Sequence, residues 1–279
     1  MKFTNEKLRL EDRKMELNEI ILFALIIMCT YFIEGLIGFG GTIMALPLAS
    51  MVIGLKLTVP VMTVVVLIAS IIIAVRDYKY IDIRKFAKIS LLMILGLPIG
   101  MWLFKFLPER SLKILLGIFM IGVAIKGLYD VFIKVKKEPK LVYEEEFAVD
   151  SESESLECKT SKGMRILEDI ILFIGGIIHG AFTCGGPFVV VYATKNIKNK
   201  SSFRATLCAL WATLNIIMLT INIFNGEINF QIIKISAITM IFVFIAIVVS
   251  NIVHKKINGD IFTKFVYIAL FISGILMMV

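Results

Sequence analysis

Two ionisable side chains, Glu34 and His179, each stand at the beginning of a glycine-rich cluster within apolar sequence. The first cluster reads Gly35-Leu-Ile-Gly-Phe-Gly40-Gly41, and the second reads Gly180-Ala-Phe-Thr-Cys-Gly185-Gly186-Pro187. Ionisable groups are costly to bury in a membrane, so their presence favours a role in transport. A carboxylate and an imidazole together could relay protons along a transport path. The alternative, that helix-end carbonyls satisfy both groups, is left open by the sequence.

The glycine clusters themselves indicate an anion site. A helix that begins after a glycine break presents unpaired backbone N–H groups and the positive end of its dipole, and both suit an anion. Hydroxyl and thiol groups beside the glycines add further donors. The alternative is close helix packing through small residues, but two clusters at matched positions favour a substrate path. The candidate substrate-binding residues in the clusters are Gly40, Gly41, Thr42, Thr183, Cys184, Gly185 and Gly186.

Polar residues outside the clusters extend the list of candidates. Arg204 begins an apolar segment, and its planar guanidinium could bind a sulfonate, sulfite or carboxylate through two hydrogen bonds. A snorkelling anchor at the membrane interface is the competing and favoured interpretation of Arg204. Asn215 and Asn222 lie about two turns apart on one helix face, where they either line the path or join helices. Arg76 and Asp77 are expected at the membrane interface.

The candidate residues fall in an internal repeat. Sliding the chain by 145 residues aligns Glu34–Ser70 with His179–Asn215 without a gap. A repeat whose glycines lie inside apolar segments of bilayer length is the pattern of a transporter built from two related halves.

The composition is that of a membrane protein. The 279 residues are 58% hydrophobic and 19% charged, with a mean hydropathy of +0.90, whereas soluble domains have about 45–50% apolar and about 25% charged residues. Ile20–Ile33, Thr58–Val75 and Ala237–Ser250 contain no charged residue. About 20 helical residues span a bilayer core about 30 Å thick. We therefore predict an all-α, multi-pass membrane protein.

Eight apolar segments, four in each half, are expected to form the membrane helices. The lead segment of the first half would be about 54 Å long as one straight helix, which is too long for the bilayer core. Glycine and proline weaken a helix interior, so each lead segment is predicted to break, within Gly35–Thr42 and Gly180–Pro187, with the two breaks meeting near the bilayer midplane. The segments are Ile20–Leu55, Thr58–Val75, Ile89–Phe104, Leu112–Ile133, Ile166–Ala193, Phe203–Phe224, Ile232–Val253 and Phe262–Val279.

The segments divide the chain into four parts. These are a charged N-terminal segment (1–19), a first transmembrane repeat (20–133), a hydrophilic acidic linker (134–165) and a second transmembrane repeat (166–279). The linker has few apolar residues and is expected to be solvated and poorly ordered.

The loop charges bear on the relation between the halves. If each broken segment returns to its starting side, the halves are inverted, and one membrane side carries 19 Lys and Arg residues against 9 on the other. If each crosses once, the halves are parallel and the count is 17 to 11. The positive-inside rule favours inversion. Trp102 and Trp211 are expected to pack or to anchor the chain at the interface.

Other classes of function are disfavoured. The net charge of +8 lies in short loops, where the positive-inside bias explains it without nucleic acid. Four scattered cysteines and two distant histidines indicate no disulfide framework, metal site or cofactor. No nucleotide-binding loop supports an ATP-driven pump, and no clustered acid–base residues support an enzyme. An anion channel and a membrane assembly protein stay open as alternatives to a secondary transporter.

The motifs, taken in order, resemble the TauE/SafE family of sulfite exporters and toluene-sulfonate uptake permeases. They are Gly-Phe-Gly-Gly followed by Pro47, Ile81-Asp82, the Cys-Gly-Gly-Pro cluster and Phe203-Arg-Ala-Thr206. The resemblance implies a secondary carrier of small anions in the cytoplasmic membrane, for sulfite or organosulfur anions such as sulfonates, with coupling to protons. The chain departs from the family pattern in its long acidic linker, and Thr183 stands where the first half has Gly38. Substrate identity, transport direction and oligomeric state are not determined by the sequence.

Overall fold

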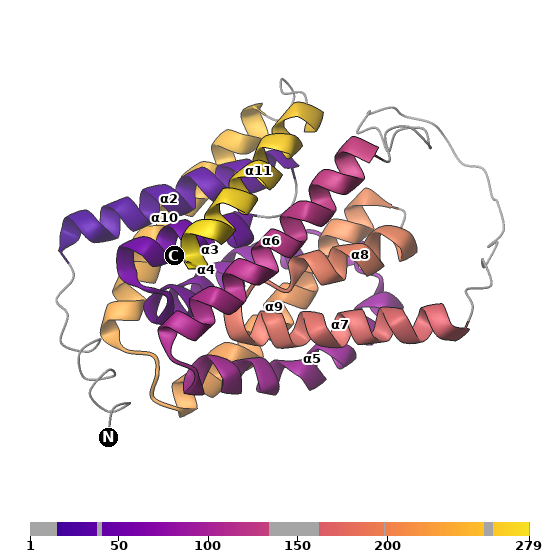
Figure 1. The fold of residues 1–279 in the computed structure, drawn as a ribbon, viewed down its shortest axis with the longest axis horizontal. Helices are drawn as coiled ribbons and strands as arrows, with labels where there is room; N and C mark the ends of the chain where they lie inside the picture. The colour runs from indigo at the N-terminus through magenta and orange to yellow at the C-terminus, as the bar shows by residue number, and fades with distance from the viewer. Residues whose placement is uncertain (1–15, 38–40, 134–161, 198, 254–258, 279) are drawn as a thin grey trace.

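The computed structural model describes residues 16–37, 41–133, 162–197, 199–253 and 259–278, which form helices and short connections without a β-strand. The first half contains α2 (Leu17–Ile37), α3 (Gly41–Ile53), α4 (Leu55–Arg76), the 3-10 helix η1 (Tyr78–Tyr80), α5 (Ile83–Phe106) and α6 (Glu109–Ile133). The second half contains α7 (Lys162–Phe182), α8 (Gly186–Asn196), α9 (Lys200–Phe224), α10 (Phe230–Val253) and α11 (Gly259–Met278) (Figure 1).

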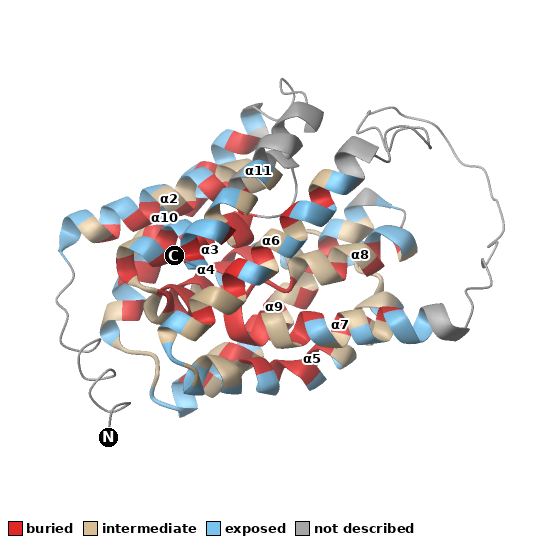
Figure 2. Cartoon of the chain, viewed as in Figure 1, coloured by how far each residue is buried: buried red, intermediate tan, exposed pale blue. Residues whose placement is uncertain are grey.

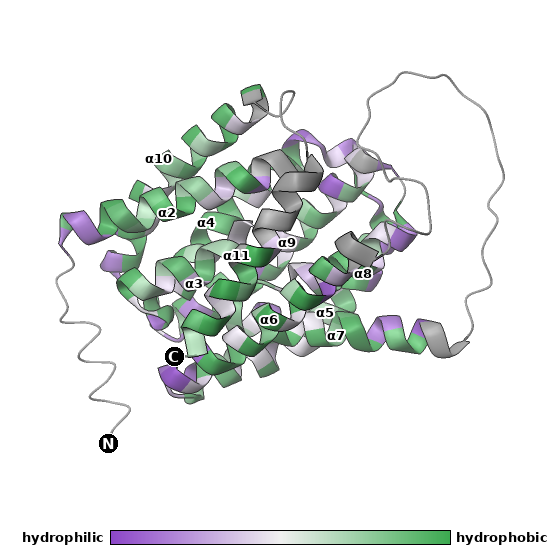
Figure 3. Ribbon diagram, turned by 45° about the horizontal axis from the view of Figure 1, so that its top comes forward, coloured by the Kyte–Doolittle hydropathy of each residue, from purple (hydrophilic) through white to green (hydrophobic). Residues whose placement is uncertain are grey.

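Six of the described helices are long and apolar enough to cross a membrane, namely α2, α4, α5, α6, α9 and α10. Figure 3 shows hydrophobic residues along much of their length. Helix α3 is apolar but shorter, and α7 carries Arg165, Glu168 and Asp169 in its first turns. The described chain is therefore an all-helical, multi-pass membrane protein, whereas the count of eight membrane segments stays a prediction.

Polar caps set several helix starts ahead of the apolar runs. The Asp82 side chain accepts a hydrogen bond from the Lys85 N–H at 3.1 Å, and Asn199 accepts one from the Ser202 N–H at 3.0 Å. A side-chain oxygen at this position satisfies a backbone donor that has no intrahelical partner. Helix α5 consequently begins at Ile83, although its apolar run begins at Ile89.

Both lead segments are broken where the glycines predict. Helix α2 ends at Ile37 and α3 begins at Gly41, while α7 ends at Phe182 and α8 begins at Gly186. The first turns of α3 and the end of α7 belong to one apolar cluster, which includes Ile43, Met44, Ala181, Phe182 and Cys184. The residues after the first break and those at the second break therefore share one apolar cluster, while residues 38–40 lie outside the described part of the chain. The depth of the breaks in the bilayer stays a prediction.

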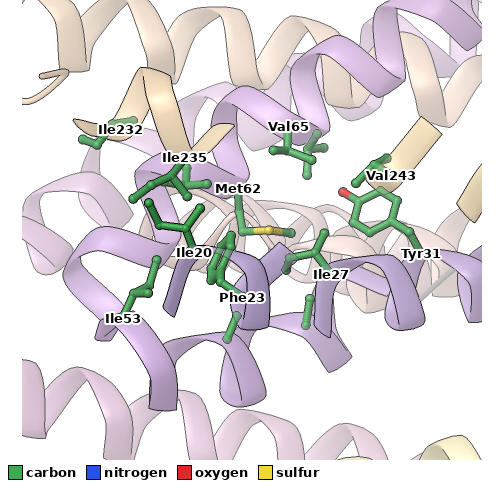
Figure 4. Packing of buried hydrophobic residues seen from close by; sticks show 14 of the residues in the cluster. Ile20, Phe23, Ile27, Tyr31, Ile53, Met62, Val65, Ile232, Ile235 and Val243 are labelled. Carbon is green, nitrogen blue, oxygen red and sulfur yellow. The ribbon is translucent and has the colours of Figure 1, made fainter. Parts of the chain in front are cut away.

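Each broken segment folds into a hairpin. Ile53, at the end of α3, packs with Ile20 and Phe23 near the start of α2 (Figure 4). At the break, a side chain on Gly41 would collide with Glu34, so α3 runs back along α2. In the second half, Gly175 of α7 faces Phe188 of α8 in the same manner. Each hairpin brings the chain back toward the end at which it started.

The two halves are interlocked, because most helices pack against a helix of the other half. Helix α2 lies beside α10, α5 beside α7, α4 beside α9 and α6 beside α11 (Figure 1). Figure 2 shows that the buried residues gather where these helices face one another. A core shared by both halves means that neither half buries its apolar surface alone.

The directions of the paired helices follow from their contacts. Along α5 and α7, Met93 meets Gly176 and Gly100 meets Ala181, so these helices run parallel. Along α6 and α11, Gly127 meets Tyr267 while Gly117 meets Gly274, so these run antiparallel. Backbone approach this close requires residues without a large side chain.

Helices α4 and α9 also run antiparallel. Val59, at the start of α4, shares a cleft with Asn222, at the end of α9. Asp82, just beyond the end of α4, contacts Thr206 near the start of α9.

The helix boundaries repeat at the displacement seen in the sequence. Helices α2 and α7 begin at residues 17 and 162, α3 and α8 at 41 and 186, and α4 and α9 at 55 and 200. Each of these pairs is displaced by 145 residues. The packing repeats as well, since α5 on α7 corresponds to α10 on α2 when the halves are exchanged.

Candidate functional site

Thr183 lies in the break between α7 and α8. This β-branched residue has φ 57°, in the left-handed region that such residues rarely adopt. Its hydroxyl lies 3.1 Å from that of Thr63 on α4. Because the Thr63 hydroxyl donates to the Val59 carbonyl at 2.9 Å, the Thr183 hydroxyl donates to Thr63. The Thr183 hydroxyl therefore links the break to α4, and its single proton is not available to another acceptor.

His179 lies one turn before the break and is 1% exposed. Its ring stacks on the indole of Trp211 from α9, with centroids 5.2 Å apart and planes 19° apart. Nδ1 accepts a hydrogen bond from the Gly185 N–H at 3.4 Å, and Nε2 is buried without a partner among the described residues. In a neutral imidazole one nitrogen accepts and the other donates. Nε2 is therefore a buried N–H donor that lacks an acceptor.

Helix α8 begins beside His179 without a side-chain cap. Gly185 occupies the N-cap position and, having no side chain, makes no cap hydrogen bond, and Pro187 follows within the first turn. Proline is suited to this position because its missing N–H has no intrahelical partner there. The two glycines differ, since a side chain on Gly185 would strike the Gly175 carbonyl and His179, whereas Gly186 has only Trp211 near, at 3.9 Å.

Asn215, one turn beyond Trp211 on α9, and Cys184, in the break itself, are both buried but differ in their contacts. The Asn215 amide donates to the Trp211 carbonyl at 2.8 Å, and its Oδ1 has no partner among the described residues. Cys184 belongs to the apolar cluster with Phe182 and Met44. Asn215 therefore offers an unused polar atom, whereas Cys184 serves packing.

The first break has a different arrangement, because Glu34 occupies the position that corresponds to His179. The Glu34 side chain lies against Gly41 at the start of α3, where an added side chain would collide with it. Oε2 of this carboxylate is buried without a hydrogen-bond partner among the described residues. Gly40 lies outside the described residues.

A cleft of about 200 Å³ opens beside the second break, between the start of α4, the end of α5 and the end of α9. Gly180, which follows His179 in the chain, lies on its wall, and Asn222 lines it as well. At its rim Lys105 pairs with Glu227 at 3.2 Å. The other lining residues are mostly apolar, namely Val59, Pro60, Pro98, Met101, Trp102, Phe104, Phe106, Met218 and Ile221, together with Asn225.

Arg204 is not brought to either break. It is exposed near the start of α9, close to Arg76 and Asp77 at the end of α4. Of the predicted residues, the structure therefore gathers His179, Gly185, Gly186 and Thr183 at one break and Glu34, Gly41 and Thr42 at the other.

Two residues of these arrangements have no functional role in the sequence-based prediction, namely Thr63 and Trp211. Trp211 was expected to pack or anchor, and it packs, but its partner is the imidazole of His179. Its position one turn before Asn215 on the same helix was the available signal. Thr63 carried no signal, because its contact with Thr183 links residues 120 positions apart.

Two helical hairpins within interlocked halves, together with six described helices able to span a bilayer, are the features of a multi-pass membrane transporter. The family model "Sulfite exporter TauE/SafE" matches residues 23–277, and the chain belongs to this family. No curated protein and no solved structure matches the chain. The described residues contain no group of three His, Cys, Asp or Glu side chains that could hold a metal ion.

Proposed function

We propose that the protein is a proton-coupled secondary transporter of small sulfur oxyanions, sulfite or organic sulfonates, and that the anion binds at the break between α7 and α8. The observation that carries the proposal is the buried Nε2–H of His179, a donor without an acceptor among the described residues. Buried polar groups in proteins are nearly always paired, so this donor needs a partner. An oxyanion supplies one.

The start of α8 adds to the attraction for an anion. Its first N–H groups have no side-chain cap, and the helix dipole directs positive potential at the break. Gly186 leaves the backbone open to close approach. Asn215 contributes an acceptor through Oδ1 that suits a protonated or hydroxyl-bearing anion such as hydrogensulfite.

We assign proton binding to the first break, between α2 and α3. At this break the carboxylate of Glu34 already lies against Gly41, at the start of α3. A substrate anion would compete with a negative charge there, so this position does not suit it. A buried carboxylate oxygen without a partner is a site where a proton can be held. Glu34 and His179, at equivalent positions of the repeat, thus take the proton and the anion respectively.

Alternating access is supported by an inverted arrangement of the halves. Each hairpin returns the chain to its starting side, and three crossings by α4, α5 and α6 then put the second half into the membrane in the opposite sense. The antiparallel packing of the equivalent helices α4 and α9 also supports inversion. A two-fold axis that relates two antiparallel helices is perpendicular to both of them, so for membrane helices it lies in the plane of the membrane. With 19 Lys and Arg residues on one side against 9, the richer side is cytoplasmic.

The proposal is tested by flux in proteoliposomes. Sulfite, thiosulfate, methanesulfonate, sulfoacetate and acetate are supplied one at a time, with and without an imposed proton gradient. We expect saturable flux of the sulfur oxyanions, stimulated by the gradient, and little flux of acetate. Single-channel currents without saturation would identify an anion channel, and the absence of flux for the whole panel would favour an assembly role.

A further inference from the structure

A charged cluster lies at the end of the molecule opposite the cleft. Arg76 donates two hydrogen bonds to the Asp77 carboxylate, from Nε at 2.9 Å and from a second guanidinium nitrogen at 3.0 Å. These bonds, with a smaller contribution from the charge of Arg204, lower the pKa of Asp77. The cluster therefore carries two guanidinium groups and one carboxylate at neutral pH, and Arg204 is exposed beside the pair.

The cluster is built by two elements that are fixed to each other. The loop after α4 contains η1, which packs against α9. Within it, the Asp82 N–H donates to the buried Thr206 hydroxyl at 3.0 Å. Thr206 is only two residues from Arg204, so this bond holds the end of α4 close to the start of α9.

The repeat relates this cluster to the cleft. The helix starts of the two halves are related by a displacement of 145 residues. At the same displacement, Val59 is equivalent to Arg204, Arg76 to Ile221 and Asp77 to Asn222. Three lining residues of the cleft thus correspond to the three members of the cluster. In a transporter with related halves, equivalent positions at opposite ends form the two entrances of one path.

Cys208 lies beside the cluster, one turn beyond Arg204 on α9, and is half-buried. Its modification therefore reports whether a reagent reaches the protein from the end that carries the cluster.

We propose that Arg76 and Arg204 form an oxyanion-binding entrance at the end opposite the cleft. The carboxylate of Asp77, which is bound to Arg76, competes with an entering oxyanion for the guanidinium groups. A sulfonate presents the same paired acceptor oxygens to a guanidinium as a carboxylate does. The location of this entrance is independent of the transported substrate, whereas its role in uptake or export rests on the proposed function.

The test is thiol labelling of Cys208 as the single cysteine, with Cys29, Cys158 and Cys184 replaced by alanine. Membrane-impermeant maleimide is added to right-side-out and to inside-out vesicles. We expect labelling from the side that carries Arg204 and not from the cleft side. Labelling from the cleft side, or from neither side, would overturn the proposal. The labelling result does not depend on whether the protein transports the proposed substrates, so the two proposals are tested separately.

Protection from labelling tests the competition. Benzenesulfonate should protect Cys208, and neutral benzenesulfonamide should not. Loss of a hydrogen bond to a charged group is worth about tenfold in affinity, so Arg204→Gln should raise the half-protecting concentration by about this factor, and Asp77→Asn should lower it. The control is Asp169→Asn, which removes an ion pair with Lys88 elsewhere at this end of the protein. Half-protecting concentrations equal in wild type, Arg204→Gln and Asp77→Asn would overturn the role of these residues.

Discussion

The imidazole of His179 stacks on the indole of Trp211, with ring centroids 5.2 Å apart. The stack fixes the plane of the imidazole, and the Gly185 N–H fixes which nitrogen carries the proton. The remaining Nε2–H therefore has a defined direction, as a ligand-binding donor requires. The partner on which this orientation depends comes from α9, whereas the histidine comes from α7.

Replacement of His179 by phenylalanine should preserve the stack on Trp211 and remove the Nε2–H donor. We expect the affinity for methanesulfonate to fall by about tenfold or more, as for the loss of a hydrogen bond to an anion. Ligand-induced thermal shifts of the purified protein measure the change. Thr194→Val, at the far end of α8, is the control and should leave the affinity unchanged. Wild-type affinity in His179→Phe would remove this histidine from the anion site.

Neutral replacement of the two ionisable residues at the breaks should separate proton coupling from anion binding. Glu34→Gln removes the proton-carrying carboxylate and should flatten the pH profile of flux, whereas His179→Gln, at the anion site, should lower flux and keep the pH dependence of wild type. Flux in proteoliposomes between pH 5 and 8 measures the profile, with protein content in the membrane as the control. An unchanged profile in Glu34→Gln would contradict its role in proton coupling.

Alanine substitutions should separate the two neighbouring glycines of the second cluster. Gly185→Ala places a methyl group against the Gly175 carbonyl and His179, so overpacking should destabilise the protein by about 1–3 kcal/mol. Gly186→Ala meets only Trp211 at 3.9 Å, so it should fold normally and weaken anion binding by obstructing the backbone. Thermal stability and anion affinity are measured for both variants. Normal affinity with lost stability in Gly186→Ala would reduce this glycine to a packing role.

The contact between α5 and α7 should tolerate no added side chain at Gly100. A methyl group there would collide with the Ile177 carbonyl and the Ala181 backbone, which cannot move without shifting a helix. We expect Gly100→Ala to lower the melting temperature clearly. Gly122→Ala on α6 is the matched control, because nothing lies within 4 Å of its added Cβ. This control should be neutral or slightly stabilising, because alanine favours a helix by about 1 kcal/mol over glycine.

Affinity at the Arg76–Arg204 entrance should not depend on pH between about 5 and 8, since an unperturbed Asp ionises near 3.9 and Arg76 lowers the pKa of Asp77 further. The sign follows from the direction of this shift. The ion pair is present at all pH values above the ordinary range of Asp and weakens only as the pH falls through the lowered pKa. Half-protection of Cys208 by benzenesulfonate, measured across this range, checks the expectation. A steep change near pH 6 would assign control of the entrance to another group.

The sequence by itself determined the class of the protein and the positions of its breaks. Apolar runs of bilayer length specify membrane helices because the backbone must satisfy its hydrogen bonds within each segment. The glycines around Gly41 and Gly186 specify interruptions, because they and Pro187 remove the local preference for a helix. These effects are local, and they occur in both halves because the glycine clusters repeat after 145 residues.

Only the tertiary structure decided what each break offers to a ligand. Glu34 reaches the start of α3 because the hairpin brings α2 and α3 together, whereas His179 acquires its orientation from Trp211 on α9. Likewise, Thr63 of α4 meets Thr183 at the break between α7 and α8, and Asp77 approaches Arg204 because α4 packs against α9. Such contacts depend on the packing of helices distant in sequence, which hydrophobic burial selects without leaving a local pattern in the chain.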